Sequence, residues 1–283
     1  MIERIKMKIT DCHCHVYPDA LAAKAVGAIA SFYDFEVTDD MLRRGTVADM
    51  TERERKAGVG HQVIFSVATT PHQVSSINHF IARDVENSGG TLTGLGTIHP
   101  DSPNLKADID EIISLGLKGI KIHPDFQQTK ADDHRYLKVY EYCEGRLPVL
   151  IHCGDCRKDY SNPNRILPIL EIFTGLTVIG AHLGGWSVWD DAIKYLPGHD
   201  NFYVDCSSVF EFTGALKAYE IMKAYGAEKI LFGTDYPMKT PEEELEILFG
   251  LGFSERELDL ITHLNAEKIF GINTYAVEYP FPL

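Results

Sequence analysis

The chain has 283 residues, of which 45% are hydrophobic and 24% charged, and its formal net charge is −14. This is the balance of a globular protein with a large core, so the composition excludes an intrinsically disordered chain. The negative charge repels phosphate backbones and makes nucleic acid an unsuitable partner. We therefore expect the partner to be a small-molecule substrate, and a homo-oligomer is left open.

The sequence has no feature of a membrane protein. No stretch approaches the roughly 20 consecutive apolar residues that a membrane-spanning helix needs. Residues 1–8 lack the apolar core of a secretory signal, so we expect a cytoplasmic protein without membrane partners. The six cysteines are expected to be free buried thiols, because a chain of this size needs no disulfides and has no export signal. Cys12 and Cys14 alternate with His13 and His15 and are expected to face the outer helices.

Short apolar runs with β-forming residues alternate with helical patterns along the whole chain. Eight such runs occur, at residues 7–16, 62–68, 92–99, 117–123, 148–153, 177–182, 202–207 and 229–235. Strands that alternate with helices form parallel sheets through right-handed crossovers. From the second run onward their starts lie 25 to 31 residues apart, which is the length of one strand–helix unit. We therefore predict one α/β domain over residues 1–283, a closed (βα)8 TIM barrel.

Residues 17–60 are longer than one crossover and contain the aromatic residues Phe32, Tyr33 and Phe35. We predict that they form a helical insertion after the first strand, which adds a small cap over the mouth of the barrel.

Helix-capping residues appear late in the chain. Pro241 follows a threonine, and a proline at the first helical position predicts a helix start there. Ser254 and Glu257 have the spacing of a capping box, which predicts a second helix. Asn265 is expected to cap the last helix, and Gly271 to end it.

Histidines and an aspartate recur at the ends of the predicted strands. His13 and His15 lie two residues apart in the first run, so both point to one side and can bind one cation. This pair alone is equally typical of a polar strand end. However, His152, His182 and Asp235 end the fifth, sixth and eighth runs, and catalytic groups of α/β barrels gather at these carboxyl ends. Imidazoles and carboxylates suit zinc, manganese or ferrous iron and leave a position for water.

The sequence resembles the amidohydrolase superfamily, specifically the amidohydrolase-related branch of TIM-barrel metal-dependent hydrolases that are similar to aminocarboxymuconate-semialdehyde decarboxylase. The resemblance covers nearly the whole chain and rests on Asp11-x-His13-x-His15, PVLIHCG around His152, VIGAHLGG around His182, ILFGTDYP around Asp235, and the closing NAEKIFG. It implies that His13, His15, His152 and Asp235 bind a divalent metal, with zinc favoured over manganese or iron. It also implies that His182 either joins a second metal or orients the attacking water.

Lys121 and His123 share one face of the fourth predicted strand, and Ile120 and Ile122 take the other. Several amidohydrolases use a carboxylated lysine on this strand to bridge two metals, so the resemblance makes Lys121 a candidate further ligand. Two other interpretations are a residue that binds a substrate carboxylate, which His123 would assist, and a buried lysine paired with an acid.

The leading hypothesis is a metal-dependent hydrolase that acts on an amide, lactone or ester bond of a small carboxylated molecule. A divalent cation lowers the pKa of its bound water to about 7. Asp235 can accept the proton of that water and deliver it to the leaving group, while His182 polarises the substrate or the water. One alternative is non-oxidative decarboxylation of a small carboxylic acid at the same site. A second is a non-catalytic metal- or ligand-binding barrel, which predicts a missing acid or base, whereas Asp235 and His182 are both present.

Overall fold

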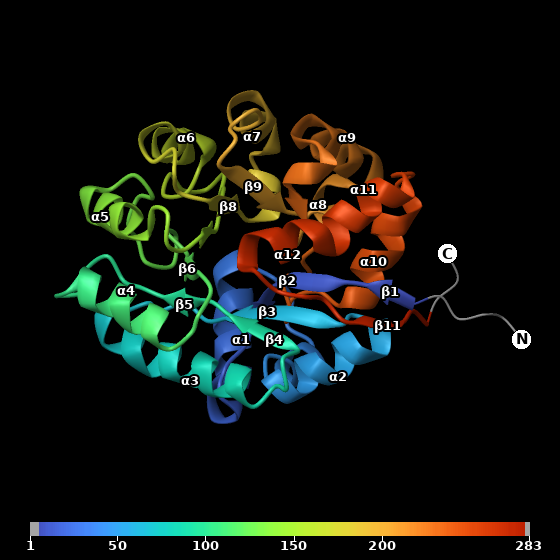
Figure 1. The fold of residues 1–283 in the computed structure, drawn as a ribbon, viewed down its shortest axis with the longest axis horizontal. Helices are drawn as coiled ribbons and strands as arrows, with labels where there is room; N and C mark the ends of the chain where they lie inside the picture. The colour runs from blue at the N-terminus through green and yellow to red at the C-terminus, as the bar shows by residue number, and fades with distance from the viewer. Residues whose placement is uncertain (1–5, 281–283) are drawn as a thin grey trace, which may run out of the picture.

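The computed structural model describes residues 6–280, and parallel strands lie at the centre of the molecule with helices around them (Figure 1). The barrel strands are β2 (Thr10–His15), β3 (His61–Phe65), β4 (Leu92–Gly94), β5 (Gly96–Thr97), β6 (Ile120–Ile122), β7 (Val149–Ile151), β8 (Val178–Gly180), β9 (Phe202–Asp205) and β10 (Ile230–Leu231). Each overlaps one of the predicted runs. The first five residues of the segment 1–8 lie outside the described residues.

The strands close into a barrel. β2, β3 and β4 form a three-stranded sheet and β5 to β10 a six-stranded one, and β4 and β5 are one interrupted strand, so the barrel has eight strands. The barrel closes between β2 and the segment after β10. There the Asp235 amide donates to the His13 carbonyl at 3.0 Å, and the His15 amide donates to the Tyr236 carbonyl at 2.7 Å. The predicted (βα)8 barrel is confirmed.

Helices follow the strands and cover the outside of the barrel (Figure 1). The larger ones are α2 (Val47–Ala57), α3 (Val74–Glu86), α4 (Leu105–Ser114), α5 (His134–Cys143), α6 (Pro163–Ile172), α7 (Trp189–Tyr195), α9 (Ala215–Tyr225) and α10 (Pro241–Gly250). Shorter elements are η1 (Met41–Arg43), η2 (Pro71–Gln73), η3 (His182–Gly184), α8 (Phe210–Thr213), η4 (Ala227–Lys229), α11 (Glu255–Asp259), η5 (Leu260–Leu264) and α12 (Asn265–Phe270). β1 (Lys6–Lys8) pairs antiparallel with β11 (Ala276–Glu278).

The core has two layers, because alternate residues of a strand face opposite sides of the sheet. Ile64 faces the helices, whereas Val63 and Phe65 pack inside the barrel. Cys12 also packs inside, so the prediction that Cys12 and Cys14 both face the outer helices is wrong for Cys12. A shift in register between Asp11 and Cys14 breaks the alternation.

Most of the helix ends agree with the sequence prediction. α10 begins at Pro241, Ser254 and Glu257 form a capping box for α11, and Gly271 ends α12 in the left-handed conformation with φ of 63°. Asn265 does not cap α12, so that prediction is wrong. Because η5 leads into α12 without a break, the Asn265 side chain instead donates to two backbone carbonyls, at 2.8 and 2.7 Å.

The insertion after β2 contains α1 (Asp19–Tyr33), whose last turn reaches a cavity at the mouth of the barrel.

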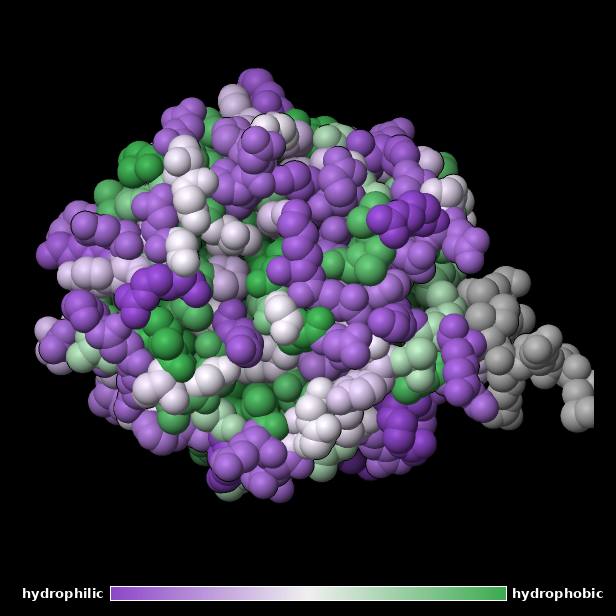
Figure 2. Space-filling model, in the orientation of Figure 1, coloured by the Kyte–Doolittle hydropathy of each residue, from purple (hydrophilic) through white to green (hydrophobic). Residues whose placement is uncertain are grey.

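No helix in the described range 6–280 has both the length and the apolar character needed to cross a membrane. Figure 2 shows that one face of the molecule is mainly hydrophilic, with separate small hydrophobic areas. All six cysteines are free, but Cys156 is exposed, so the expectation of buried thiols is wrong at that position.

Candidate active site

Polar side chains from several strands meet at the carboxyl ends of the barrel strands. A cavity of about 460 Å³, open mouth included, lies there. Its lining comprises His15, Ile29, Tyr33, Phe35, His123, Phe126, His152, His182, Trp186, Ser208, Asp235, Pro237 and Met238. Active sites of (βα)8 barrels lie at this end.

His13, His15 and Asp235 form a triangle of donor atoms. The two histidine Nε2 atoms are 3.3 Å apart, and Asp235 Oδ1 lies 3.4 Å from that of His13 and 3.6 Å from that of His15. Both histidine rings are buried, and the Asp235 side chain is 16% exposed. Zinc ligands at about 2.0–2.1 Å in a tetrahedron lie about 3.3 Å from one another. The three donors therefore fit a cation of this size.

Burial keeps both histidines of the triangle in the neutral form that binds metals. It lowers the pKa of His13 and His15 well below the usual value, and the charge of nearby Lys121 adds to the effect. His13 Nδ1 lies 2.9 Å from Asp205 Oδ2 and donates its hydrogen to that carboxylate. The Nε2 lone pair of His13 is thereby directed at the triangle, as in the carboxylate–histidine pairs of metal sites.

Asp235 follows β10 at a turn that fixes its orientation. Its φ of 67° is uncommon for a residue other than glycine, and backbone hydrogen bonds to His13 and Met238 hold this turn. Oδ2 accepts a hydrogen bond from Ser208 Oγ at 2.7 Å, which leaves Oδ1 directed at the histidines. Burial raises the pKa of Asp235 to about 7, against the opposing effect of the Ser208 hydrogen bond.

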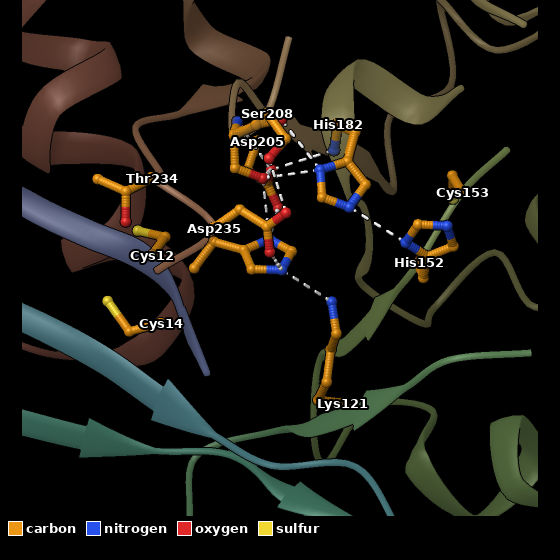
Figure 3. Close-up of polar contacts among 12 residues, drawn as sticks. Cys12, Cys14, Lys121, His152, Cys153, His182, Asp205, Ser208, Thr234 and Asp235 are labelled. Carbon is orange, nitrogen blue, oxygen red and sulfur yellow. Dashed lines mark hydrogen bonds and ion pairs between the residues drawn. The ribbon is translucent and has the colours of Figure 1, made fainter. Parts of the chain in front are cut away.

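Lys121 extends from β6 toward His13, and Figure 3 shows its side chain pointing to the side of Asp235. Its Nζ lies 3.1 Å from His13 Nε2, and its side chain is fully buried. Burial lowers the pKa of Lys121 to about 8, although the charges of Asp205 and Asp235 oppose this shift. The cavity lining includes His123 but not Lys121.

His152 and His182 lie beside the triangle and bind each other. His152 Nδ1 is 3.1 Å from His182 Nε2, and Figure 3 shows the two rings pointing toward one another. Burial lowers the pKa of His182 to about 4 and that of His152 well below its usual value. Three of the four ligands that the resemblance implies thus lie together, and the fourth, His152, lies beside them in contact with His182.

A second group of donors, His123, Asp125 and His152, has an unsuitable geometry for a metal. All three side chains are buried. However, the rings of His123 and His152 are stacked, with centroids 3.8 Å apart and planes inclined by 8°. The nitrogen lone pairs lie in the ring planes, so those of two parallel stacked rings do not converge on one cation.

Sequence reasoning missed several residues of this site, and two of them, Asp205 and Tyr33, contact its histidines. Asp205, fully buried at the end of β9, binds both His13 and the backbone amide of His182. The rule that selected Asp235 would also have selected Asp205, since it lies in the seventh predicted run. Tyr33 contacts His123 and His152 from α1, and no local pattern in the insertion marks it.

A family model described as Amidohydrolase matches residues 10–272 of the chain. Among solved structures, the chain is similar to an uncharacterized TIM-barrel protein from Bordetella bronchiseptica, with 22% identity, a TM-score of 0.76, and coverage of 94% of this chain and 99% of that one. It is also similar to 5-carboxyvanillate decarboxylase from Sphingomonas paucimobilis, with 16% identity, a TM-score of 0.76, and coverage of 94% of this chain and 99% of that one. A third similar structure is a putative 2-pyrone-4,6-dicarboxylic acid hydrolase from Pseudomonas putida, with 18% identity, a TM-score of 0.67, and coverage of 96% of this chain and 100% of that one.

No curated protein sequence matches the chain significantly. The family match spans nearly the whole barrel, and the similar structures include both a decarboxylase and a hydrolase. The chain belongs to the Amidohydrolase family.

Proposed function

We propose that the protein is a metal-dependent hydrolase that cleaves an amide, lactone or ester bond of a small carboxylated molecule. The main support is the triangle of His13, His15 and Asp235, whose donor atoms lie at the separations of metal ligands. A divalent cation bound there, with zinc favoured over manganese or iron, would lower the pKa of a water and polarise a carbonyl.

The residues of the triangle have separate roles in this proposal. His13 and His15 hold the cation through Nε2, and Asp205 keeps the proton of His13 on Nδ1. Asp235 would complete the triangle around the cation through Oδ1, and its carboxylate would accept the proton of the water and return it to the leaving group. His182, which is neutral and lines the cavity, orients the water or the substrate.

Decarboxylation is a second candidate, and the cavity lining favours it. Four aromatic residues, Tyr33, Phe35, Phe126 and Trp186, lie in the lining, and the described residues contribute no lysine or arginine to it. The metal would thus be the positive charge to which a substrate carboxylate binds in this cavity. An apolar pocket also disfavours a charged carboxylate, which promotes its loss as neutral carbon dioxide.

Two measurements on purified protein test these proposals. Elemental analysis should give about one divalent metal per chain, whereas two would support Lys121 and His182 as further ligands. No bound metal after reconstitution would contradict both candidates. A panel of carboxylated esters, lactones, amides and aromatic acids should then be assayed for acid release and for carbon dioxide release, which separates hydrolysis from decarboxylation.

The non-catalytic alternative has its own test. If it is correct, the metal-loaded protein binds members of the panel without turnover, and Asp235→Asn does not differ from the wild type in any assay. A loss of turnover in Asp235→Asn with the metal retained would contradict it.

A further inference from the structure

The helix α1 forms one wall of the cavity but has little buried surface of its own. The buried residues of this 15-residue helix are Ala22, Val26 and Ala30. Alanine and valine side chains are small and remove little apolar surface from water, so they contribute little to keeping the helix in place. At the C-terminal end of α1, Tyr33 lines the cavity, and its hydroxyl lies 3.0 Å from His123 Nε2. The position of this end therefore decides whether the cavity is covered.

Arg157, in the loop after β7, binds this end of α1 through its guanidinium. Nη1 donates to the Phe32 carbonyl at 3.0 Å. Phe32 lies in the last turn, where backbone carbonyls lack a partner within the helix and the helix dipole is negative. The last turn of α1 contains no basic residue, so a cation from the barrel takes that place. The guanidinium also lies 5.4 Å from the centroid of the Phe32 ring and 5.3 Å from that of Tyr33, and it stabilises both rings as a cation–π partner.

Asp155 fixes the orientation of the guanidinium. Its carboxylate accepts hydrogen bonds from Nε at 2.9 Å and from Nη2 at 2.8 Å, and its side chain is fully buried. The Asp155 amide donates to Asn162 Oδ1 at 2.9 Å. Because a guanidinium is planar, two bonds to one carboxylate leave Nη1 pointing in one direction, which is that of the Phe32 carbonyl. The barrel therefore holds the end of α1 at a defined place.

Trp186, between η3 and α7, lines the cavity beside the same guanidinium. The centroid of its ring lies 5.9 Å from the Arg157 guanidinium. The Tyr33 ring packs edge-on against the Trp186 ring, with centroids 5.0 Å apart. Two side chains that cover the cavity, one from α1 and one from the barrel, thus meet at Arg157.

We propose that Arg157 is a positioning residue that holds α1 as a closed lid over the cavity. With the guanidinium in place, Tyr33 covers His123, which is 3% exposed. Without the guanidinium, the end of α1 detaches in a larger fraction of the molecules and opens the cavity, while the barrel stays folded. The same cavity would serve hydrolysis and decarboxylation, so the inference goes beyond either reaction.

Hydrogen exchange of the Arg157→Met variant, measured by mass spectrometry, tests the proposal. Methionine keeps an unbranched apolar stem but has no hydrogen-bond donor. Loss of a hydrogen bond from a charged group should make the amides at the end of α1 exchange roughly 10- to 100-fold faster. They include the amides of Asp34 and Phe35, which both donate to the Ala30 carbonyl. Amides of the outer helix α9 should exchange at the wild-type rate.

Carbethoxylation of His123 by diethyl pyrocarbonate gives a second readout. The reagent modifies imidazoles that it can reach, and peptide mass spectrometry locates the modified ring. In chelator-treated Arg157→Met, His123 should react faster than in the wild type by about the same factor as the α1 amides exchange, because both processes take place in the open state. His134, whose side chain is 79% exposed, is the internal reference and should react equally in both proteins.

Arg135→Met is the matched control. Arg135 follows Asp133 at the spacing at which Arg157 follows Asp155, and its Nε and Nη2 donate to the Asp133 carboxylate at 2.8 and 3.0 Å. Its Nη1, however, donates to Asp101 instead of to the end of α1. Arg135→Met should therefore leave both readouts at their wild-type values, and the same changes in this variant would contradict a specific role of Arg157.

Three results for Arg157→Met would overturn the proposal. They are unchanged exchange at the end of α1, an unchanged rate at His123, and equally faster exchange in α1 and α9, which would indicate a less stable fold instead of an open lid. If the unpaired Asp155 carboxylate prevents folding, Asp155→Asn combined with Arg157→Met removes that buried charge and should give the same two increases. Neither readout requires a metal or turnover, so failure of the proposed reaction is detected separately.

Discussion

Replacement of Asp205 by asparagine should weaken metal binding through the tautomer of His13. Asp205 Oδ1 accepts hydrogen bonds from the backbone amides of His182 and Ser207, at 3.1 and 3.2 Å. These amides can only donate, so they select the oxygen of an asparagine side chain. The asparagine NH₂ then takes the place of Oδ2 and donates to His13 Nδ1, which lies 2.9 Å from that position in the wild type. His13 would have to carry its proton on Nε2, the atom directed at His15 and Asp235.

The expected loss of metal affinity follows from this exchange of hydrogen-bond donor and acceptor between His13 and residue 205. A metal must remove the proton from His13 Nε2 before that nitrogen can bind it. Loss of a hydrogen-bond partner behind a ligating histidine costs about 10- to 100-fold in metal affinity. This corresponds to about 1.4–2.7 kcal/mol of binding free energy.

A competitive zinc titration against a chromophoric chelator measures the effect. The matched control is Asp200→Asn, the same change at an exposed position. Thermal melts of both variants show whether they remain folded. If folded Asp205→Asn bound zinc as tightly as the wild type, the role assigned to His13 Nε2 would be refuted.

Three further predictions concern acid–base catalysis, pH and the metal. At a zinc concentration that saturates the variant, Asp235→Asn should lower kcat by about 10²- to 10⁴-fold, and a variant with near wild-type kcat would contradict the assigned proton transfer. Burial raises the pKa of Glu244 from 4.5 to about 8, so only the folded state retains this proton between these pH values. Stability should therefore fall, by at most about 1.4 kcal/mol per pH unit, as the pH rises from 4.5 to 8, and denaturant titrations of Glu244→Gln should lack this contribution. Zinc at 100 times its dissociation constant should stabilise the fold by about 2.7 kcal/mol, seen as a melting temperature that a chelator lowers again; an unchanged melt would indicate no site in the folded state.

The barrel could be predicted from the sequence because its signals are local. Apolar runs at a regular spacing define the strands, and residues such as Pro241 and Ser254 define helix starts within a few positions. Strand alternation predicted that Lys121 would lie apart from its neighbours Ile120 and Ile122, which face the helices. The same rule failed at Cys12, because a shift in register depends on pairing with the next strand and has no signature in one segment.

The candidate site could be predicted only in part. The sequence alone predicted that His13, His15, His152, His182 and Asp235 lie at one end of the barrel, since the carboxyl ends of parallel strands share an edge. Only the tertiary structure decided which nitrogen of each ring faces which partner, because hydrogen bonds join residues far apart in the chain. The 3.0 Å contact between Tyr33 and His123, which lie 90 positions apart, arises from the packing of α1 against the barrel, and no spacing within either segment encodes it.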